Sequence, residues 1–87
     1  MSRTKVKPSI QRFGEKLKDL RLDKGLTLQQ FAESLGYSAH GYISELETGK
    51  KTPTVEFVLS VSLMYDVSID ELLKDDLDLN LSPKKRH

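Results

Sequence analysis

Residues 25–53 contain two short amphipathic segments, each opened by a hydroxyl side chain and closed by a glycine. The first runs from Thr27 to Gly36, and the second runs from Ser38 to Gly49. Because Ser and Thr favour the start of a helix and glycine favours its end, this order predicts two helices. The turn between them is expected to be too tight to hold a loop, so the helices must cross steeply. The second helix then projects from the body with one face free.

Three further helices are expected around this pair. Within residues 9–25, apolar side chains recur at intervals of three and four, which marks one stripe of a helix. Thr54 begins a strongly apolar helix, and Ser68 with Glu71 forms the capping-box pattern S-x-x-E of a short last one. The apolar face of the helix after Thr54 consists of Val55, Val58, Leu59, Ser62, Leu63 and Met64. Residues 9–74 therefore predict an all-α domain of five helices, with no convincing strand.

Length and composition narrow the class of protein. A chain of 87 residues forms one domain, and at this size it buries only about 60% of its unfolded surface, so a partner would add stability. The absence of cysteine excludes disulfides, and with His40 and His87 as the only histidines no zinc or other metal site is expected. No apolar run approaches the roughly 20 residues of a membrane span, and no secretory signal precedes the domain. No nucleophile, carboxylate pair or cofactor motif is spaced for catalysis, so we expect a cytoplasmic protein that is not an enzyme.

Charge is distributed unevenly along the chain, although the net charge is only +1. Residues 1–25 hold eight Lys or Arg against three Asp or Glu, whereas residues 52–83 hold one against seven. Because the local field governs attraction, the basic end can approach phosphates while the acidic end faces away. Residues 1–8 are expected to form a basic flexible arm ahead of the domain.

The C-terminal tail, residues 75–87, differs from the helical domain. Its leucines alternate with polar residues, a period of two instead of 3.6. Three alternatives remain open: a disordered tail, a strand that pairs with its copy across a dimer, or an extended segment laid along the body. The candidate dimer contacts in this tail are Leu77, Leu79 and Leu81.

An ordered set of residues carries a family resemblance. The set comprises Arg21, G-L-T at 25–27, F-A at 31–32, Gly36, I-S at 43–44, L-E-T-G-K at 46–50, Pro53 and V-S-I-D-E-L-L at 67–73. From about Leu17 to Leu72, the chain resembles the Cro and phage-repressor type of helix-turn-helix domain, also called Xre-like. The resemblance implies a compact lambda-repressor-like fold of five helices, with its motif at residues 28–48. It also implies a sequence-specific transcriptional regulator that acts as a homodimer on a palindromic operator.

The resemblance further implies a structural salt bridge between Arg21 and Glu47, which ties the first helix to the end of the third. The residue types agree, because arginine can hold a carboxylate through two hydrogen bonds. Two features depart from the family's pattern. Leu28 occupies the position of a common glutamine that touches phosphate, and Gly36 lies seven residues before Ile43, where six is usual. An additional residue therefore sits in the turn or in the first turn of the next helix.

The outward side of the 38–48 helix is expected to read bases in the major groove. That groove presents acceptors at guanine, an amino donor at cytosine and a methyl group at thymine. His40 suits guanine, Glu45 suits the cytosine amino group and Ala39 suits the thymine methyl. Each has an alternative, since His40 also fits a polar turn, Glu45 a solvated acid, and Tyr42 a half-buried ring with its hydroxyl towards a phosphate. The candidate base-reading residues are Ala39, His40, Tyr42, Ser44 and Glu45.

Phosphate attraction must come from around this helix, because no Lys or Arg lies between Ser38 and Thr48. The candidate phosphate contacts are Gln29, Tyr37, Ser38, Thr48, Lys50, Lys51 and Thr52. Double-stranded DNA and a second copy of the chain are thus the expected partners. The lysine-free helix and the acidic 52–83 segment also fit a second class, a protein-interaction module such as an antitoxin that binds DNA mainly in complex with a partner protein.

Overall fold

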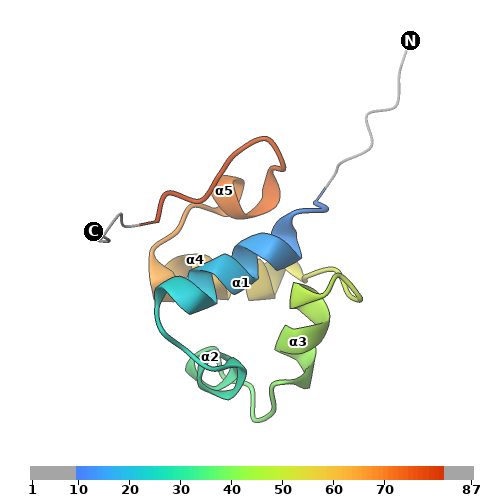
Figure 1. Ribbon diagram of the computed structural model, residues 1–87, viewed down its shortest axis with the longest axis vertical. Coiled ribbons are helices and arrows are strands. Elements are labelled where there is room, and N and C mark those ends of the chain that lie inside the picture. Colours follow the sequence, from blue (N-terminus) through green and yellow to red (C-terminus); the bar gives the residue numbers. More distant parts are fainter. Residues whose placement is uncertain (1–9, 82–87) are drawn as a thin grey trace.

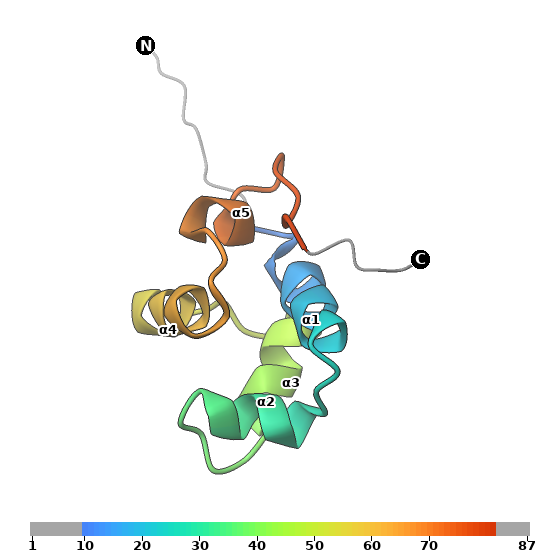
Figure 2. The same cartoon turned by 90° about the vertical axis from the view of Figure 1, so that its left-hand side faces the viewer.

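The computed structural model describes residues 10–81, which form five helices and no strand, as predicted from the sequence. The helices are α1 (Phe13–Asp23), α2 (Leu28–Ser34), α3 (Gly41–Glu47), α4 (Val55–Tyr65) and α5 (Ile69–Leu73). Figure 1 shows α2 and α3 together at one end of the molecule and α5 at the other, and Figure 2 shows α1 and α4 on opposite sides between them. The predicted arm, residues 1–8, and the end of the tail, residues 82–87, lie outside the described residues. Within residues 10–81, no helix is long and apolar enough to cross a membrane.

Hydroxyl side chains begin three of these helices, α2, α4 and α5, as predicted. Thr27 Oγ1 accepts from the backbone N–H of Gln30 at 3.0 Å, and Gln30 Oε1 accepts from the N–H of Thr27 at 2.9 Å, which completes a capping box on α2. Thr54 caps α4 by accepting from the third backbone N–H after it. The prediction for α3 is wrong, because that helix begins at Gly41 and not at Ser38.

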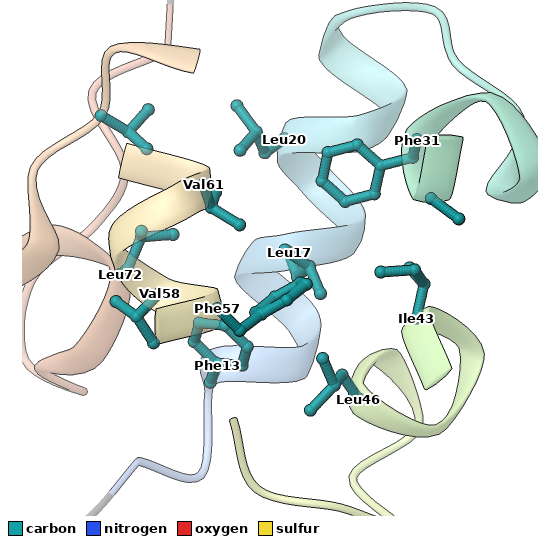
Figure 3. Close-up of a cluster of buried hydrophobic side chains, with 12 residues drawn as sticks. Phe13, Leu17, Leu20, Phe31, Ile43, Leu46, Phe57, Val58, Val61 and Leu72 are labelled. Carbon is teal, nitrogen blue, oxygen red and sulfur yellow. The ribbon is translucent and has the colours of Figure 1, made fainter. Parts of the chain in front are cut away.

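The core lies between α1 and the other four helices (Figure 3). Its buried apolar side chains are Phe13, Leu17, Leu20, Phe31, Ala32, Ile43, Leu46, Phe57, Val58, Val61, Val67 and Leu72. Of the six residues expected on the apolar face of α4, only Val58 is buried, and the helix turns Phe57 and Val61 inward beside it. Because α4 is apolar nearly all round, its periodicity does not select the face that meets the core. Its outer side carries the exposed residues Val55, Leu59, Leu63 and Met64.

The helices α1 and α3 approach each other closely at Gly14. A Cβ atom at this position would lie 2.5 Å from the carbonyl oxygen of Leu46 and 2.6 Å from that of Glu47, the last two residues of α3. Real Cβ atoms do not approach a backbone oxygen so closely. The absence of a side chain at Gly14 therefore allows the end of α3 to dock against the start of α1.

A buried lysine joins α1 to α5. The Lys16 side chain is only 2% exposed, and its Nζ donates to the backbone oxygens of Glu71 at 2.6 Å and Lys74 at 2.5 Å. These oxygens lie at the C-terminal end of α5, where unpaired carbonyl groups favour a positive charge. Lys16, on α1, thus supplies a hydrogen-bond donor to the free carbonyl groups at the end of α5.

The first part of the tail, residues 75–81, lies along the body of its own chain, which is the third of the three alternatives. The carboxylate of Asp75 accepts from the backbone N–H groups of Gln11 at 3.1 Å and Arg12 at 3.0 Å, immediately before α1. The Arg12 guanidinium donates in return to the Asp75 backbone oxygen at 2.8 Å and to Asp78 Oδ1 at 2.9 Å. The hydrogen bond to Asp78 raises the pKa of Arg12 above its ordinary value.

Further along, the tail also contacts α5. Ser68 Oγ caps this helix by accepting from the backbone N–H of Glu71 at 3.3 Å, as predicted. The Glu71 carboxylate does not complete the capping box; it accepts from the backbone N–H of Asn80 in the tail at 3.2 Å. Among the three tail leucines, Leu79 and Leu81 pack against the core, and Leu77 is 37% exposed.

Candidate nucleic-acid interface

A linker of six residues, 35–40, joins α2 to α3. The prediction that the turn is too tight to hold a loop is therefore wrong. The chain leaves α2 through Gly36, at a φ of +91°, and passes through bends at residues 38–40 before it turns helical. The hydrogen bonds of α3 begin with the N–H of Ser44 donating to the backbone oxygen of His40 at 2.9 Å. A hydroxyl caps a helix only where helical backbone follows directly, and here it does not. The N-cap position of α3 is thus His40, two residues after Ser38.

Apolar and aromatic contacts fix the inner side of α3. Ile43 and Leu46 are buried in the core. Tyr42 is half-buried beside them, with its ring centroid 5.4 Å from that of Phe57 and 5.3 Å from that of Tyr37. Burial raises the pKa of the Tyr37 phenol above its ordinary value. The structure therefore places Tyr42 within an aromatic cluster at the base of α3.

The salt bridge between Arg21 and Glu47 is present and fixes the far end of α3. Arg21 Nε donates to Glu47 Oε2 at 2.7 Å, and Nη2 donates to Oε1 at 3.1 Å. The two side chains are only 11% and 7% exposed. A third bond runs from Arg21 Nη1 to the backbone oxygen of Leu26 at 3.0 Å. This two-pronged contact sets the orientation of α3 relative to α1.

The side chain of Gln29 holds the linker from α2. Its Nε2 donates to the backbone oxygen of Ser38 at 3.0 Å and to Glu33 Oε2 at 2.9 Å. Gln29 is half-buried, whereas Ser38 is exposed. The amide of this candidate phosphate contact is thus engaged within the protein.

The outer side of this region displays the other base-reading candidates. Ala39 and His40 are exposed in the linker, and Ser44 and Glu45 are partly exposed on α3. Because His40 is the N-cap of α3 and Ser44 lies four residues later, these two side chains share one face of the helix, and Glu45 points further round it. Glu45 Oε1 lies 3.6 Å from Lys51 Nζ, so a cation accompanies the acid.

The phosphate candidates follow the end of α3. Gly49, at a φ of +84°, terminates the helix, and Lys50 and Lys51 come directly after it with exposed side chains. Thr48 is exposed, but its hydroxyl donates to the backbone oxygen of Ser44 at 3.0 Å. Ser38 and Thr52 are exposed, and Tyr37 is half-buried. Two lysines therefore supply positive charge immediately beside a helix that has none.

Sequence reasoning missed the contacts of three residues, of which Gln29 lies at this interface and the other two lie beside the start of α1. Gln29 was assigned only to phosphate, although a Gln–Glu pair four residues apart on a helix signals a contact between the two side chains. Lys16 lies on the apolar stripe of α1, three residues after Phe13. A lysine within an apolar stripe is the signal that could have predicted its burial. Asp75 gave no local signal, because its partners lie more than 60 residues away in the chain.

Within residues 10–81, no group of three or more His, Asp or Glu side chains is placed to hold a metal ion.

Comparison with known proteins supplies relatives for this arrangement. The helix-turn-helix family model matches residues 17–72. The HTH-type transcriptional activator BcrR of Enterococcus faecalis is 44% identical over 64 residues, which are 74% of this chain and 31% of BcrR. The HTH-type transcriptional regulator SinR of Bacillus subtilis is 36% identical over 63 residues, which are 71% of this chain and 56% of SinR. The chain thus spans less than two thirds of the length of either relative.

Solved structures that are 33% and 34% identical to this chain share its fold. The N-terminal DNA binding domain of SinR from Bacillus subtilis has a TM-score of 0.68 and 33% identity, and the match covers 76% of this chain and 96% of that domain. A crystal structure of SinR in complex with DNA has a TM-score of 0.63 and 34% identity, and the match covers 69% of this chain and 95% of that one.

Proposed function

We propose that this chain, which belongs to the Cro and phage-repressor type of helix-turn-helix family, is a sequence-specific DNA-binding transcriptional regulator. The observation that carries the proposal is the way α3 is held. Buried Ile43 and Leu46 and the ion pair of Glu47 fix its inner side, while polar groups line its outer side. A helix presented in this way fits the major groove of B-DNA, which is about 12 Å wide. The DNA complex of SinR, which shares this fold, supports the proposal.

In this proposal, the linker and the outer side of α3 read base edges. His40 donates to guanine, Glu45 accepts from cytosine and Ala39 packs on a thymine methyl, while Ser44 serves a base or a phosphate. Lys50 and Lys51 attract the phosphates on one flank. Other contributors to the interface are Tyr37, Ser38, Tyr42, Thr48 and Thr52.

We further propose that the chain acts as a homodimer through the exposed apolar side of α4 and α5. Four large apolar residues of α4 and Ile69 of α5 are exposed, and an apolar groove runs between the two helices. Figure 2 shows α4 on the side of the molecule away from α1, which leaves α3 free for DNA. Since Leu79 and Leu81 pack on their own chain, Leu77 is the tail leucine best placed to extend the contact. Two half-sites would then lie about one helical turn, 34–36 Å, apart.

Its relatives are named transcriptional regulators, and we propose that this chain likewise works in the cytoplasm by binding and not by catalysis. A second candidate function is an antitoxin-like module that binds DNA mainly in complex with a partner protein. Two observations favour it: α3 itself contains no Lys or Arg, and residues 52–81 carry seven acids against one lysine. Binding of DNA by the purified chain alone separates the two functions.

The test is selection of DNA from a random library by the purified full-length chain, without added protein. We expect a palindromic sequence to be enriched and to bind more tightly than a scrambled duplex at several salt concentrations. Asp19→Asn, an exposed change on α1 outside both proposed surfaces, serves as a control that should select the same sequence. Failure of the pure chain to select any sequence, together with selection once a partner protein is present, would establish the second function instead.

A further inference from the structure

The linker that carries Ala39 and His40 is held at few points. At its start, the backbone N–H groups of Gly36 and Tyr37 donate to Glu33 and Ala32 at 3.1 and 2.9 Å, and at its end α3 begins on the His40 oxygen. Between these two anchors the chain passes through exposed bends at residues 38–40. The hydrogen bond from Gln29 to the Ser38 oxygen reaches the linker in the middle of this stretch.

The geometry leaves the Gln29 amide one sensible orientation. Its two partners, the Ser38 carbonyl and the Glu33 carboxylate, are both acceptors, so the NH₂ group must face them and the amide oxygen must face away. Both amide protons are thereby used. The hydrogen bond to the charged Glu33 carboxylate is stronger than the one to the neutral Ser38 carbonyl. Glu33 therefore holds the rotamer of Gln29, and Gln29 holds the linker.

We propose that Gln29 is a positioning residue for base recognition, and that it is not a phosphate contact; this rests on the proposed function. The Ser38 carbonyl shares its peptide plane with the N–H of Ala39. Fixing that plane sets the direction in which Ala39 and His40 leave the backbone. Without the brace, the linker must be ordered when DNA binds, and ordering the backbone of one residue corresponds to about a tenfold change in an equilibrium constant.

Positioning and phosphate contact predict different binding data. A phosphate contact acts on every DNA sequence alike, whereas a brace on the base-reading residues acts only where bases are read. Gln29→Ala and the equally long Gln29→Met both remove the two donors. We expect each to weaken binding to the selected sequence about tenfold, to relax the preference at the base pairs facing Ala39 and His40, and to leave the affinity for scrambled DNA unchanged.

Gln30→Ala is the matched control. The Gln30 side chain accepts from the Thr27 N–H and completes the capping box at the end of α2 opposite the linker, so its loss should lower the melting temperature while the base preference stays the same. Backbone ¹⁵N relaxation of the free protein gives an independent readout. In the Gln29 variants, the order parameters at residues 38–40 should fall relative to that of Ile43.

The outcomes separate this inference from the proposed function. If the wild-type chain selects no sequence, the proposed function fails and the DNA role of Gln29 fails with it. Should the wild type select a sequence that the Gln29 variants prefer equally well, only the present inference is overturned. Equal losses on selected and scrambled DNA would instead identify Gln29 as a phosphate contact.

Discussion

Arg21 holds both carboxylate oxygens of Glu47, through Nε at 2.7 Å and Nη2 at 3.1 Å. The pair joins the last turn of α1 to the last turn of α3, and both side chains are almost completely buried. An isolated charge at this depth would carry a large desolvation cost, which the partner offsets. The direction in which α3 points thus depends on an ion pair as well as on apolar packing.

Arg21→Ala should destabilise the domain by about 3–5 kcal/mol, because it leaves the Glu47 carboxylate buried without its partner. Arg21→Lys should recover only part of this loss, since lysine keeps the charge but not the two-pronged geometry. Lys24→Ala is the control, because the Lys24 side chain is 39% exposed and lies 3.8 Å from Asp23 in a loose pair. Urea denaturation followed by circular dichroism measures the free energy of unfolding. Equal stability of the Arg21 and Lys24 variants would contradict the structural role of the pair.

Gly14→Ala should be destabilising even though alanine is the better helix former by about 1 kcal/mol. A Cβ atom at this position meets two backbone oxygens at 2.5 and 2.6 Å, so α3 would have to move, at a cost of about 1–3 kcal/mol. Gly41→Ala, at the start of α3, is the matched control, because a Cβ atom there meets nothing within 4 Å. Thermal unfolding should show a lower melting temperature for the first variant only. A rise for both would show that α1 and α3 do not meet this closely.

Much of the fold follows from local signals in the sequence. Thr27, Thr54 and Ser68 all cap helices as their chemistry predicts, because a hydroxyl acceptor at such a position satisfies a free N–H within the same short segment. Ser38 carries the same signal and does not cap. The aromatic packing of Tyr37 and the brace from Gln29 extend the linker beyond it. The capping propensity of Ser38 is a local signal, and here tertiary contacts of the linker outweigh it.

The rest of the structure depends on pairings that no local pattern encodes. The alternating leucines of the tail are compatible with any extended conformation, and the choice is made by Asp75 and Arg12 from opposite ends of the chain. Likewise, α4 is apolar nearly all round, so its sequence does not show that Phe57 faces the core and Leu63 faces outward. For the candidate site, the sequence indicated which residues are polar and near α3, but not how the linker presents them.

Asp75→Ala should lower the free energy of unfolding by about 1–3 kcal/mol, because two backbone N–H groups lose a charged acceptor. Its carboxylate accepts from the backbone N–H groups of Gln11 and Arg12, immediately before α1, and the Arg12 guanidinium donates to the Asp75 backbone oxygen. The neighbouring Asp76 is exposed, so Asp76→Ala makes the same change of charge without removing these hydrogen bonds. Denaturation of both variants in parallel provides the measurement. An equal effect of the two would mean that net charge, and not the pair of hydrogen bonds, is responsible.

Leu63→Glu should weaken the proposed homodimer by more than about tenfold, since burying a leucine contributes about 1.5–3 kcal/mol. The side chain is 76% exposed on the outer face of α4, so its replacement should leave the fold of the single chain intact. Leu22→Glu, at a 56% exposed leucine on α1, is the matched control. Sedimentation equilibrium over a range of concentrations gives the dissociation constants. If both variants dimerise like the wild type, the α4 face is not the interface.

Lys50→Ala should change the affinity for DNA and its salt dependence, whereas His40→Ala should change the base preference. The pair tests whether phosphate contact and base reading are made by different residues around α3. Lys50 is exposed directly after the helix, so its loss should weaken all sequences alike and reduce the slope of log K against log salt by about 0.9. His40 lies in the exposed linker, so its loss should change the preference at one base pair per half-site and leave the slope unaltered. Fluorescence anisotropy at four salt concentrations, on selected and scrambled duplexes, measures both quantities. An unchanged slope with relaxed preference for Lys50→Ala would show that the lysine reads bases and does not bind phosphate.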